Sequence, residues 1–196
     1  MVNPEKTEKQ KMFDGELYNA GENSLMRDRY KARQVLRKFN GTSEEDYSLA
    51  ELYEVRTKIL TKFLGKMGNN CWIEPPFYCD YGYNIFLDEG VYMNFNCTIL
   101  DPNKVHIGKR VQIGSNVQII TATHPLDAEL RTLGPELAYE ISIGNQVWIG
   151  SGVIILPGVT IGSDSTIGAG SVVTKDIPPS VVAVGNPCRI VKKLQK

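Results

Sequence analysis

The chain has 196 residues, of which 42% are hydrophobic and 22% are charged, as is typical of a soluble globular protein. Its 22 Lys and Arg residues balance its 22 Asp and Glu residues, so net charge favours neither nucleic-acid nor membrane binding. The sequence has no apolar run long enough for a transmembrane helix, and its charged start is unlike a signal peptide. Cys71, Cys79, Cys97 and Cys188 match no metal or redox spacing, which predicts reduced thiols in a cytoplasmic protein.

The spacing of apolar residues within residues 1–65 predicts an N-terminal helical segment. Apolar residues recur at helical intervals across residues 24–39 and again across residues 48–64. Ser48 and Glu51 have the spacing of a capping box, which marks the start of the second helix. The Asn40-Gly41 pair between the two stretches predicts a break.

Residues 66–196 follow a period of six, which fits neither a helix nor one long strand. Such a period predicts very short strands separated by turns, with three sixes to a coil and roughly five stacked coils. Two-residue slips interrupt a weaker phase of the repeat near Ile85 and near Asn103. The regular aliphatic positions, which we expect to point inward, are Ile107, Ile113, Ile119, Ile143, Ile149, Ile155, Ile161, Ile167 and Val173.

Two segments depart from the repeat. Residues 178–196 contain a Pro-Pro pair and a basic amphipathic end, which predict a cap over the last coil. Residues 121–140 form a long polar insertion, and a loop of that length inside a compact repeat is usually functional. The insertion carries His124, and a neutral imidazole, with an ordinary pKa of about 6.5, can accept a proton from a hydroxyl group.

The segments "GELYNA", "RDRY", "MNFN", "THP", "VWIGSG" and "IGAGS" together resemble the hexapeptide-repeat acyltransferases, and in particular the maltose/galactoside O-acetyltransferase branch. The resemblance implies a mainly β fold, a left-handed parallel β-helix. It also implies a cytoplasmic homotrimer with active sites between the subunits and acetyl-CoA as the acetyl donor, acting on a sugar hydroxyl. No nucleic acid, membrane or metal ion is expected.

The resemblance also implies roles for individual residues. His124 would be the general base of a direct transfer, and Asn94 would lie beside the acceptor hydroxyl. Either Glu136, in the same loop, or a backbone carbonyl would fix the imidazole tautomer, unless Glu136 is simply a solvated carboxylate.

Further residues carried over from the family bind the two substrates. Arg29, Asp80 and Tyr83 would contact the acceptor together with Asn94. Galactoside members have an acidic residue where Asn19 and Ala20 stand here, which leaves the identity of the acceptor open. The residues expected to bind acetyl-CoA are Trp148, Ser151, Ala169, Thr174, Lys175, Arg189 and Lys192.

Other readings of the sequence remain. A carbonic-anhydrase-like metalloenzyme of this fold needs three histidine ligands, whereas this chain has only His106 and His124. A non-catalytic β-helix scaffold would need neither the loop histidine nor a cleft for CoA. Among acetyltransferases, the acceptor could instead be a hydroxylated antibiotic or another non-sugar alcohol, although the helical N-terminal segment favours a sugar.

Overall fold

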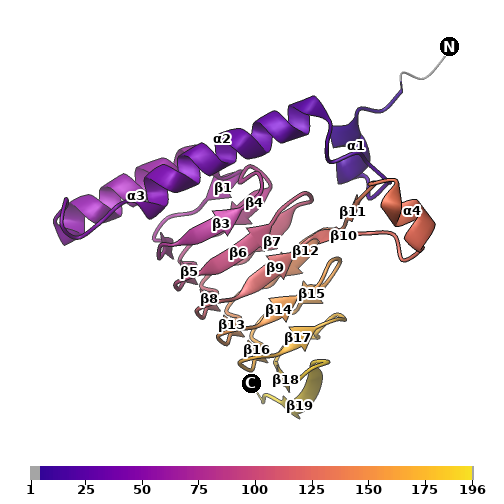
Figure 1. The fold of residues 1–196 in the computed structure, drawn as a ribbon. Coiled ribbons are helices and arrows are strands. Elements are labelled where there is room, and N and C mark those ends of the chain that lie inside the picture. Colours follow the sequence, from indigo (N-terminus) through magenta and orange to yellow (C-terminus); the bar gives the residue numbers. More distant parts are fainter. Residues whose placement is uncertain (1–4, 196) are drawn as a thin grey trace.

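The computed structural model describes residues 5–195 as a tapering parallel β-helix whose wide end is crossed by two long helices (Figure 1). The predicted parallel β-helix is therefore confirmed. Three parallel sheets form its sides. The first contains β1 (Lys66–Met67), β4 (Ile85–Leu87), β7 (Val105–Ile107), β12 (Ile141–Ile143) and β15 (Thr160–Ile161). The second contains β2 (Trp72–Ile73), β5 (Tyr92–Met93), β8 (Gln112–Ile113), β13 (Trp148–Ile149), β16 (Thr166–Ile167), β18 (Val181–Val184) and β19 (Arg189–Lys193). The third contains β3 (Phe77–Cys79), β6 (Cys97–Leu100), β9 (Gln118–Ile120), β14 (Ile154–Ile155) and β17 (Val172–Val173).

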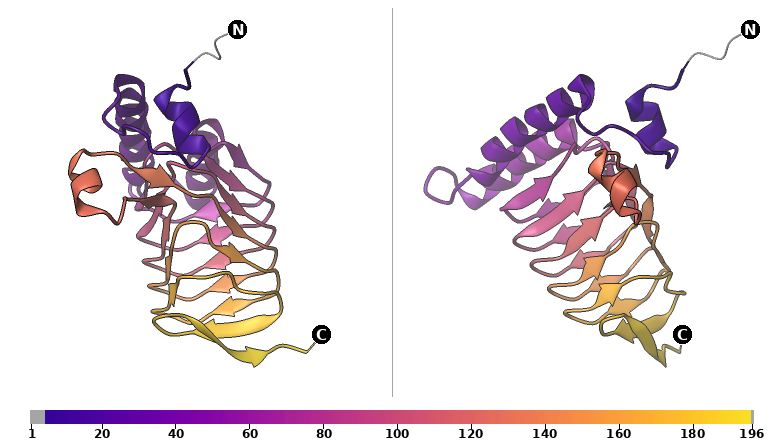
Figure 2. Two further views of the ribbon diagram at one scale, coloured as in Figure 1. Left: turned by 90° about the vertical axis from the view of Figure 1, so that its right-hand side faces the viewer. Right: turned by 45° about the vertical axis from the view of Figure 1, so that its right-hand side comes forward.

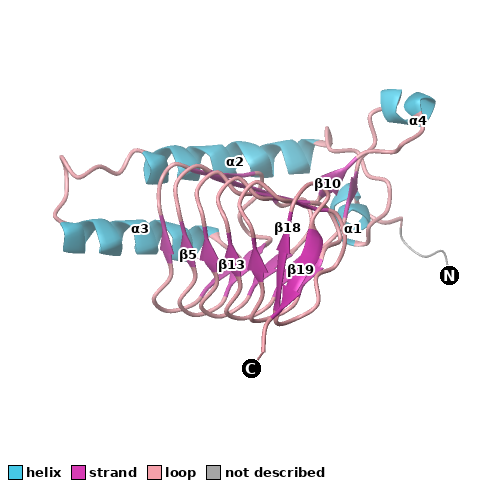
Figure 3. Cartoon of the chain, turned by 90° about the horizontal axis from the view of Figure 1, so that it is seen from below, coloured by secondary structure: helices cyan, strands magenta, loops and turns pink. Residues whose placement is uncertain are grey.

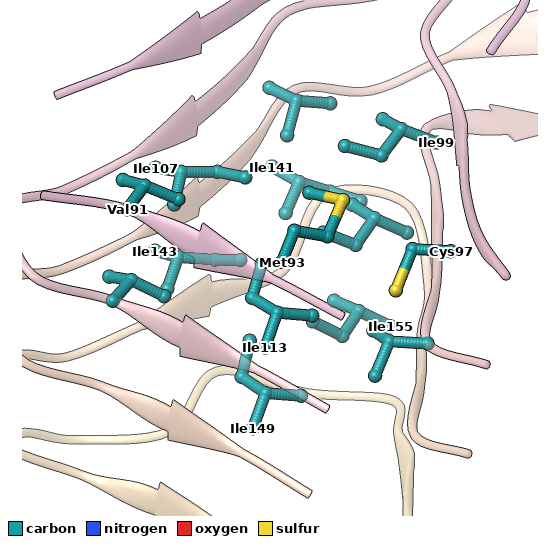
Figure 4. Close-up of a cluster of buried hydrophobic side chains, with 14 of the residues drawn as sticks. Val91, Met93, Cys97, Ile99, Ile107, Ile113, Ile141, Ile143, Ile149 and Ile155 are labelled. Atoms are coloured by element: carbon teal, nitrogen blue, oxygen red, sulfur yellow. The ribbon is translucent and has the colours of Figure 1, made fainter. Parts of the chain in front are cut away.

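The aliphatic position of each six points into the prism and stacks on its equivalent in the next coil. Ile143 pairs with Ile161, eighteen residues further along, so three sixes complete one coil as predicted. The same stacking joins Ile149 to Ile113 in the second sheet. These side chains are almost fully buried and make a continuous apolar column through the molecule (Figure 4). Their burial is the main source of stability for strands of two to four residues, which would not persist alone.

Glycine follows these aliphatic positions because adjacent coils approach each other closely at the corners. A Cβ atom on Gly150 would lie 2.5 Å from the backbone nitrogen of Ala169 in the next coil. A Cβ on Gly144 would lie 2.6 Å from the backbone nitrogen of Ser163. Only glycine leaves room for the neighbouring backbone at these two positions.

All departures from the period of six fall on one corner column, the one where the third sheet passes to the first. Leu87 pairs with Ile107, twenty residues further along, and the two additional residues lie between β6 and β7. β3 and β4 are joined in the same lengthened way. The long insertion, residues 121–140, occupies this corner in the next coil, between β9 and β12. We call this column of corners the irregular edge.

The insertion is an arm rather than a loose loop. β10 (Ala122–Thr123) leaves the prism and pairs antiparallel with β11 (Leu137–Ala138), which returns to it. The short helix α4 (Ala128–Thr132) lies at the tip, where Asp127 caps its N-terminus by accepting the N–H of Leu130. The tip projects beyond the outline of the coils (Figures 2 and 3).

Three helices precede the prism: α1 (Glu8–Phe13), α2 (Asn23–Asn40) and α3 (Leu49–Phe63). The expected capping box at the start of α3 is present, since Ser48 and Glu51 each bond the other's backbone N–H. The end of α2 is tied to the third sheet because the side-chain amide of Asn40 both donates to and accepts from the backbone of Phe77. None of the helices found in residues 5–195 is long and apolar enough to cross a membrane.

The far end of the prism is closed by the last segment of the chain. β18 continues the second sheet for one more rung, and β19 turns back to pair with it antiparallel. Five complete coils and a partial sixth thus lie within the described residues, close to the number expected from the sequence. All four cysteines are buried and free, in agreement with the prediction of reduced thiols.

We expect the core column to be sensitive to truncation on its inward face only. Ile161→Ala should lower the free energy of unfolding by about 2–5 kcal/mol, because it leaves a cavity at a side chain that is fully buried. Thr160→Ala, one residue away on the same strand and exposed, is the matched control and should change it by about 0.5 kcal/mol or less. Denaturant titration of both variants measures this, and equal losses would contradict the inward assignment.

Candidate functional site

A polar pocket of about 270 Å³ lies on the irregular edge, where the arm leaves the prism beside α2 and the segment that joins α1 to α2. It takes residues from the N-terminal segment, from the corners after β3 and β6, and from the arm. Three of the predicted site residues that are far apart in sequence, Arg29, Asp80 and His124, therefore meet in one chain. The pocket is lined by Tyr18, Ala20, Arg29, Asp80, Tyr81, Leu100, Pro102, Ala122, His124 and Glu136.

The buried carboxylate of Asp101 shapes the wall of this pocket. Its two oxygens accept the backbone N–H groups of Asp80, Tyr81 and Gly82 at 3.0, 2.9 and 2.8 Å. The corner after β3 is thereby folded around one side chain of the next coil. Burial raises the pKa of Asp101 to about 7, while the three N–H bonds oppose the rise. The lengthened corners of the first two coils thus support each other through a single group.

The corner presents Asp80 and the ring of Tyr81 to the pocket, opposite a guanidinium group from α2. Arg29 donates to the Tyr81 hydroxyl at 2.6 Å and to the backbone carbonyl of Ala20 at 2.6 Å. Burial raises the pKa of Asp80, whereas the positive charges of Arg29 and Arg33 lower it. The side of the pocket nearest α2 therefore holds a guanidinium fixed by Tyr81 and Ala20 and, near it, a carboxylate that is not hydrogen-bonded to it.

The arm is fastened to the N-terminal segment on the opposite wall. Tyr18 and Glu136 exchange two backbone hydrogen bonds, of 3.1 and 3.0 Å. The buried Tyr18 hydroxyl also donates to the Glu136 carboxylate at 2.8 Å. Asn103 completes the junction, because its side-chain amide donates to the carbonyls of Met12, Phe13 and Ala138. The base of the arm is consequently a rigid part of the pocket.

His124 stands at the first turn of the arm, directly after β10. Its neighbour Pro125 is buried, while the imidazole itself is exposed and faces the pocket. Arg131 from α4 donates to the carbonyls of Pro125 and Leu126 at 3.1 and 3.2 Å, which holds the turn that follows His124. The backbone that follows His124 is therefore held in place by the arm itself.

Comparisons with known proteins agree with this geometry. Residues 140–175 match the model described as bacterial transferase hexapeptide (six repeats), and residues 11–68 match the maltose acetyltransferase hexapeptide capping motif. The crystal structure of a maltose O-acetyltransferase from Clostridium difficile 630 superposes with a TM-score of 0.92 at 47% identity, covering 97% of this chain and 99% of the other. The galactoside O-acetyltransferase of Escherichia coli (strain K12) is 42% identical over 180 residues, which is 92% of this chain and 86% of that protein. This chain is a hexapeptide-repeat acetyltransferase.

A second solved structure bears on the ligand. A galactoside acetyltransferase in complex with coenzyme A superposes on this acetyltransferase with a TM-score of 0.91 at 40% identity, covering 97% of this chain and 92% of the other. The family membership confirms the resemblance drawn from the sequence motifs. It does not test the roles of single residues, which depend on where the structure places them.

Two of the predicted acceptor residues do not line the His124 pocket of this acetyltransferase. Tyr83 points to the other side of α2, where its hydroxyl donates to Asp28 at 3.1 Å and its ring carries the ammonium group of Lys9 at 4.0 Å. Tyr81, two residues earlier, lines the pocket instead, and the chain turns between the two rings at Gly82, whose φ is 81°.

Asn94, the second of these residues, lies at the end of the third sheet opposite to the His124 pocket. It occupies the corner before β6, whereas the His124 pocket lies beyond the end of the same strand. The four residues of β6, Cys97–Leu100, span about 10 Å at about 3.3 Å per residue, and the corner of Asn94 lies before them whereas Asp101 follows them. Within one chain, Asn94 and His124 are therefore not brought together.

The residues expected to bind CoA divide between the same two corners and the cap. All of them are exposed, and Trp148 has 57% of its surface accessible on the outer face of the second sheet. Ser151 and Ala169 follow it in the corner column of Asn94. Thr174 and Lys175 lie on the irregular edge, two coils beyond His124, and Arg189 and Lys192 lie on β19 of the cap.

Glu136 is in the pocket, but its carboxylate accepts from Tyr18, and the structure gives it no hydrogen bond with His124. Its orienting role stays a prediction. Tyr18 itself was not expected from the sequence, because nothing in the local pattern around it indicates that it will meet a residue 118 positions away. The sequence did contain a signal for the pocket residues on the two lengthened corners. The two-residue interruptions of the six-residue period, near Ile85 and near Asn103, fall at these corners.

The remaining histidine belongs to a different environment. His106 lies on β7, where its ring stacks on Phe86 with centroids 4.8 Å apart and its Nε2 is 3.6 Å from Glu140. Across the part of the chain that the structure describes, no three His, Cys, Asp or Glu side chains are grouped so as to hold a metal ion.

The raised pKa of Asp101 predicts a pH dependence of stability. Its ordinary value is 3.8 and its value in the fold is about 7, so between these values the folded chain binds a proton that the unfolded chain releases. The stabilisation is complete below about pH 4 and is lost as the pH rises through 7. We expect the free energy of unfolding to fall by about 1–4 kcal/mol over this range relative to Asp101→Asn, which cannot titrate. Denaturant titrations of both proteins from pH 4 to 8 test this, and a constant difference would contradict it.

Proposed function

We propose that this acetyltransferase transfers an acetyl group from acetyl-CoA to a sugar hydroxyl by direct attack, with His124 as general base. The observation that carries the proposal is the convergence of His124 from the arm, Arg29 from α2 and Asp80 from the corner after β3 on one polar pocket. Sugar hydroxyls require several polar partners at fixed positions, and this pocket offers a guanidinium, two carboxylates and two phenol hydroxyls. The maltose and galactoside acceptors in the names of the relatives support a sugar.

The chemistry needs one proton carrier. The neutral imidazole of His124 accepts the proton of the acceptor hydroxyl as its oxygen forms a bond to the thioester carbonyl carbon. The tetrahedral intermediate then breaks the carbon–sulfur bond, and the imidazolium returns the proton to the departing thiolate. The products are an acetyl ester and free CoA, and no covalent enzyme intermediate is formed. Asn94 would donate to the developing oxyanion without titrating.

The two carboxylates of the pocket then have different tasks. Asp80, beside Arg29, would accept hydrogen bonds from acceptor hydroxyl groups and fix the sugar ring. Glu136, fastened to Tyr18, would either bond the ring N–H of His124 after a rotamer change or bind the acceptor directly. In the second case the Tyr18 bond holds the carboxylate at the wall of the pocket.

Acetyl-CoA would lie lengthwise along the prism. Ser151 and Ala169 leave an exposed corner of small side chains beside Trp148, where a thin pantetheine chain can follow the backbone. Successive coils are about 4.8 Å apart, so these residues and the cap span an elongated ligand. Lys175, Arg189 and Lys192 would supply positive charge to the CoA phosphates.

The assembly is proposed to be a cytoplasmic homotrimer whose active sites lie between subunits. His124 and the corner column of Asn94, Ser151 and Ala169 are at opposite ends of the third sheet in one chain. Two copies of the chain that pack with these ends facing each other bring the base and the donor site together. The exposed apolar side chains at the tip of the arm, Leu126 and Leu133, favour contact with a neighbouring copy.

Removing the imidazole should abolish turnover and leave donor binding intact. We expect His124→Ala to lower kcat by on the order of 10²- to 10⁴-fold with acetyl-CoA and the best acceptor from a panel of sugars, amino sugars and hydroxylated antibiotics. Thiol release measures turnover, and calorimetric titration with CoA measures binding. His106→Ala, on the wall of the prism, is the matched control. Turnover of His124→Ala close to that of the unchanged protein would overturn the proposal.

Subunit sharing predicts complementation between two inactive variants. His124→Ala lacks the base, and Ala169→Trp would block the donor corner, because residue 169 is exposed there. Mixed trimers made by co-expression should recover part of the activity. In some of their sites the Ala169→Trp subunit supplies His124 and the His124→Ala subunit supplies the open donor corner. Mixed trimers that remain as inactive as either parent would show that each site is built within one chain.

A further inference from the structure

A second and larger cavity adjoins the His124 pocket. It measures about 650 Å³ and lies between α2 and the outer face of the third sheet, and we call it the α2 groove. Asp80 and Leu100 line both spaces, so a ligand held at His124 can extend into the groove without leaving the protein surface. The groove is lined by Arg33, Leu36, Arg37, Asn40, Gly41, Tyr78, Cys79, Asp80 and Leu100.

The helix above the groove is strongly basic in a protein of zero net charge. Residues 23–40 contain six Arg or Lys residues and one acidic residue, Asp28, which is already paired with Lys9 at 3.1 Å. Arg29, Arg33 and Arg37 recur every four residues, so they form a row on one side of the helix with steps of about 6 Å. The row begins at the His124 pocket and runs along the groove.

The last two members of the row are available to a ligand. Arg29 is engaged with Tyr81 and Ala20, whereas neither Arg33 nor Arg37 has a carboxylate within 4.0 Å among residues 5–195. Arg33 is near enough to Asp80 for its charge to lower the pKa of that carboxyl. Two guanidinium groups without carboxylate partners, four residues apart, repel each other and are stabilised by an anion placed between them.

The floor of the groove fits a sugar unit. Tyr78 on β3 has 51% of its surface accessible, which leaves a flat apolar ring with a polar tip, and Leu100 lies beside it. The far wall is rigid, because Asn40 is bonded to the backbone of Phe77 in both directions at 3.0 and 2.9 Å. The groove is therefore formed before any ligand arrives, and it combines a ring surface with a row of fixed cations.

We propose that the α2 groove binds an anionic unit of an extended acceptor: a carboxylate or phosphate on a sugar neighbouring the one that is acetylated at His124. The inference rests on the proposed function and adds the substrate class. The carboxylates of Asp80 and Glu136 suit the neutral, hydroxyl-bearing end, and the guanidinium groups of Arg33 and Arg37 suit the charged end. The protein would thus prefer anionic oligosaccharides to neutral ones.

Matched acceptors test this inference separately from the proposed function. Thiol release is measured with neutral disaccharides, with the same disaccharides carrying one uronic acid, and with the same disaccharides carrying one phosphate. For one of the anionic forms, kcat/KM should exceed that of its neutral parent on the order of 10-fold, as charge-assisted hydrogen bonds provide. The form that is preferred, uronate or phosphate, identifies the anion. The excess should shrink as salt is raised towards 1 M, where screening is strong.

The double variant Arg33→Gln/Arg37→Gln should bring the ratio of anionic to neutral kcat/KM close to one. The control Lys31→Gln/Lys38→Gln removes the same charge from the same helix outside the groove, and it should keep the ratio. A wild-type ratio near one, or an unchanged ratio in the arginine variant, would overturn the inference while activity on neutral sugars still supports the proposed function. Dissociation of the trimer by the arginine variant with an unchanged ratio would also overturn it, since the groove would then be a subunit contact.

Discussion

The burial of one aliphatic side chain per six residues is the interaction on which the whole molecule depends. Each strand has only a few residues and owes its conformation to the residue above and below it in the column, as Ile143 does to Ile107 and Ile161. Because the column must stay continuous, additional residues are accommodated only at corners, where the chain faces solvent. Function is therefore confined to insertions at corners and to the outer faces, while the interior repeats.

The irregular edge shows how such insertions become a site. In the first two coils the additional residues are held by the Asp101 carboxylate, which gathers three N–H groups of the preceding coil. In the third coil a whole arm leaves the prism and carries His124. Stacking places these three irregular corners directly above one another, so residues from separate coils share one pocket. An insertion of the same length at another corner would face a different neighbour and would leave Asp80 without His124.

The N-terminal helices contribute more than a cover for the open end of the prism. α2 brings Arg29 to the pocket and continues it as a groove bounded by Arg33 and Arg37. The Tyr18–Glu136 bond and the amide of Asn103 connect the same N-terminal segment to the arm. The geometry around His124 therefore depends on the helical segment as well as on the repeats. A protein that kept the prism alone would retain the exposed residues assigned to CoA but would lose one wall of the His124 pocket.

The sequence by itself determined the coil, because a period of six with glycine at the corners leaves few alternatives, and the register of Ile143, Ile161 and their equivalents follows from counting. It also determined that His124 lies on an insertion, and its motifs indicated the family. Contacts across long separations were decided only by the tertiary structure. The partnership of Glu136 with Tyr18 and the distance of Asn94 from His124 both depend on which corner faces which neighbour. Local sequence patterns do not predict which distant residues meet, because these contacts are set by the stacking of coils and by the packing of α2 against them.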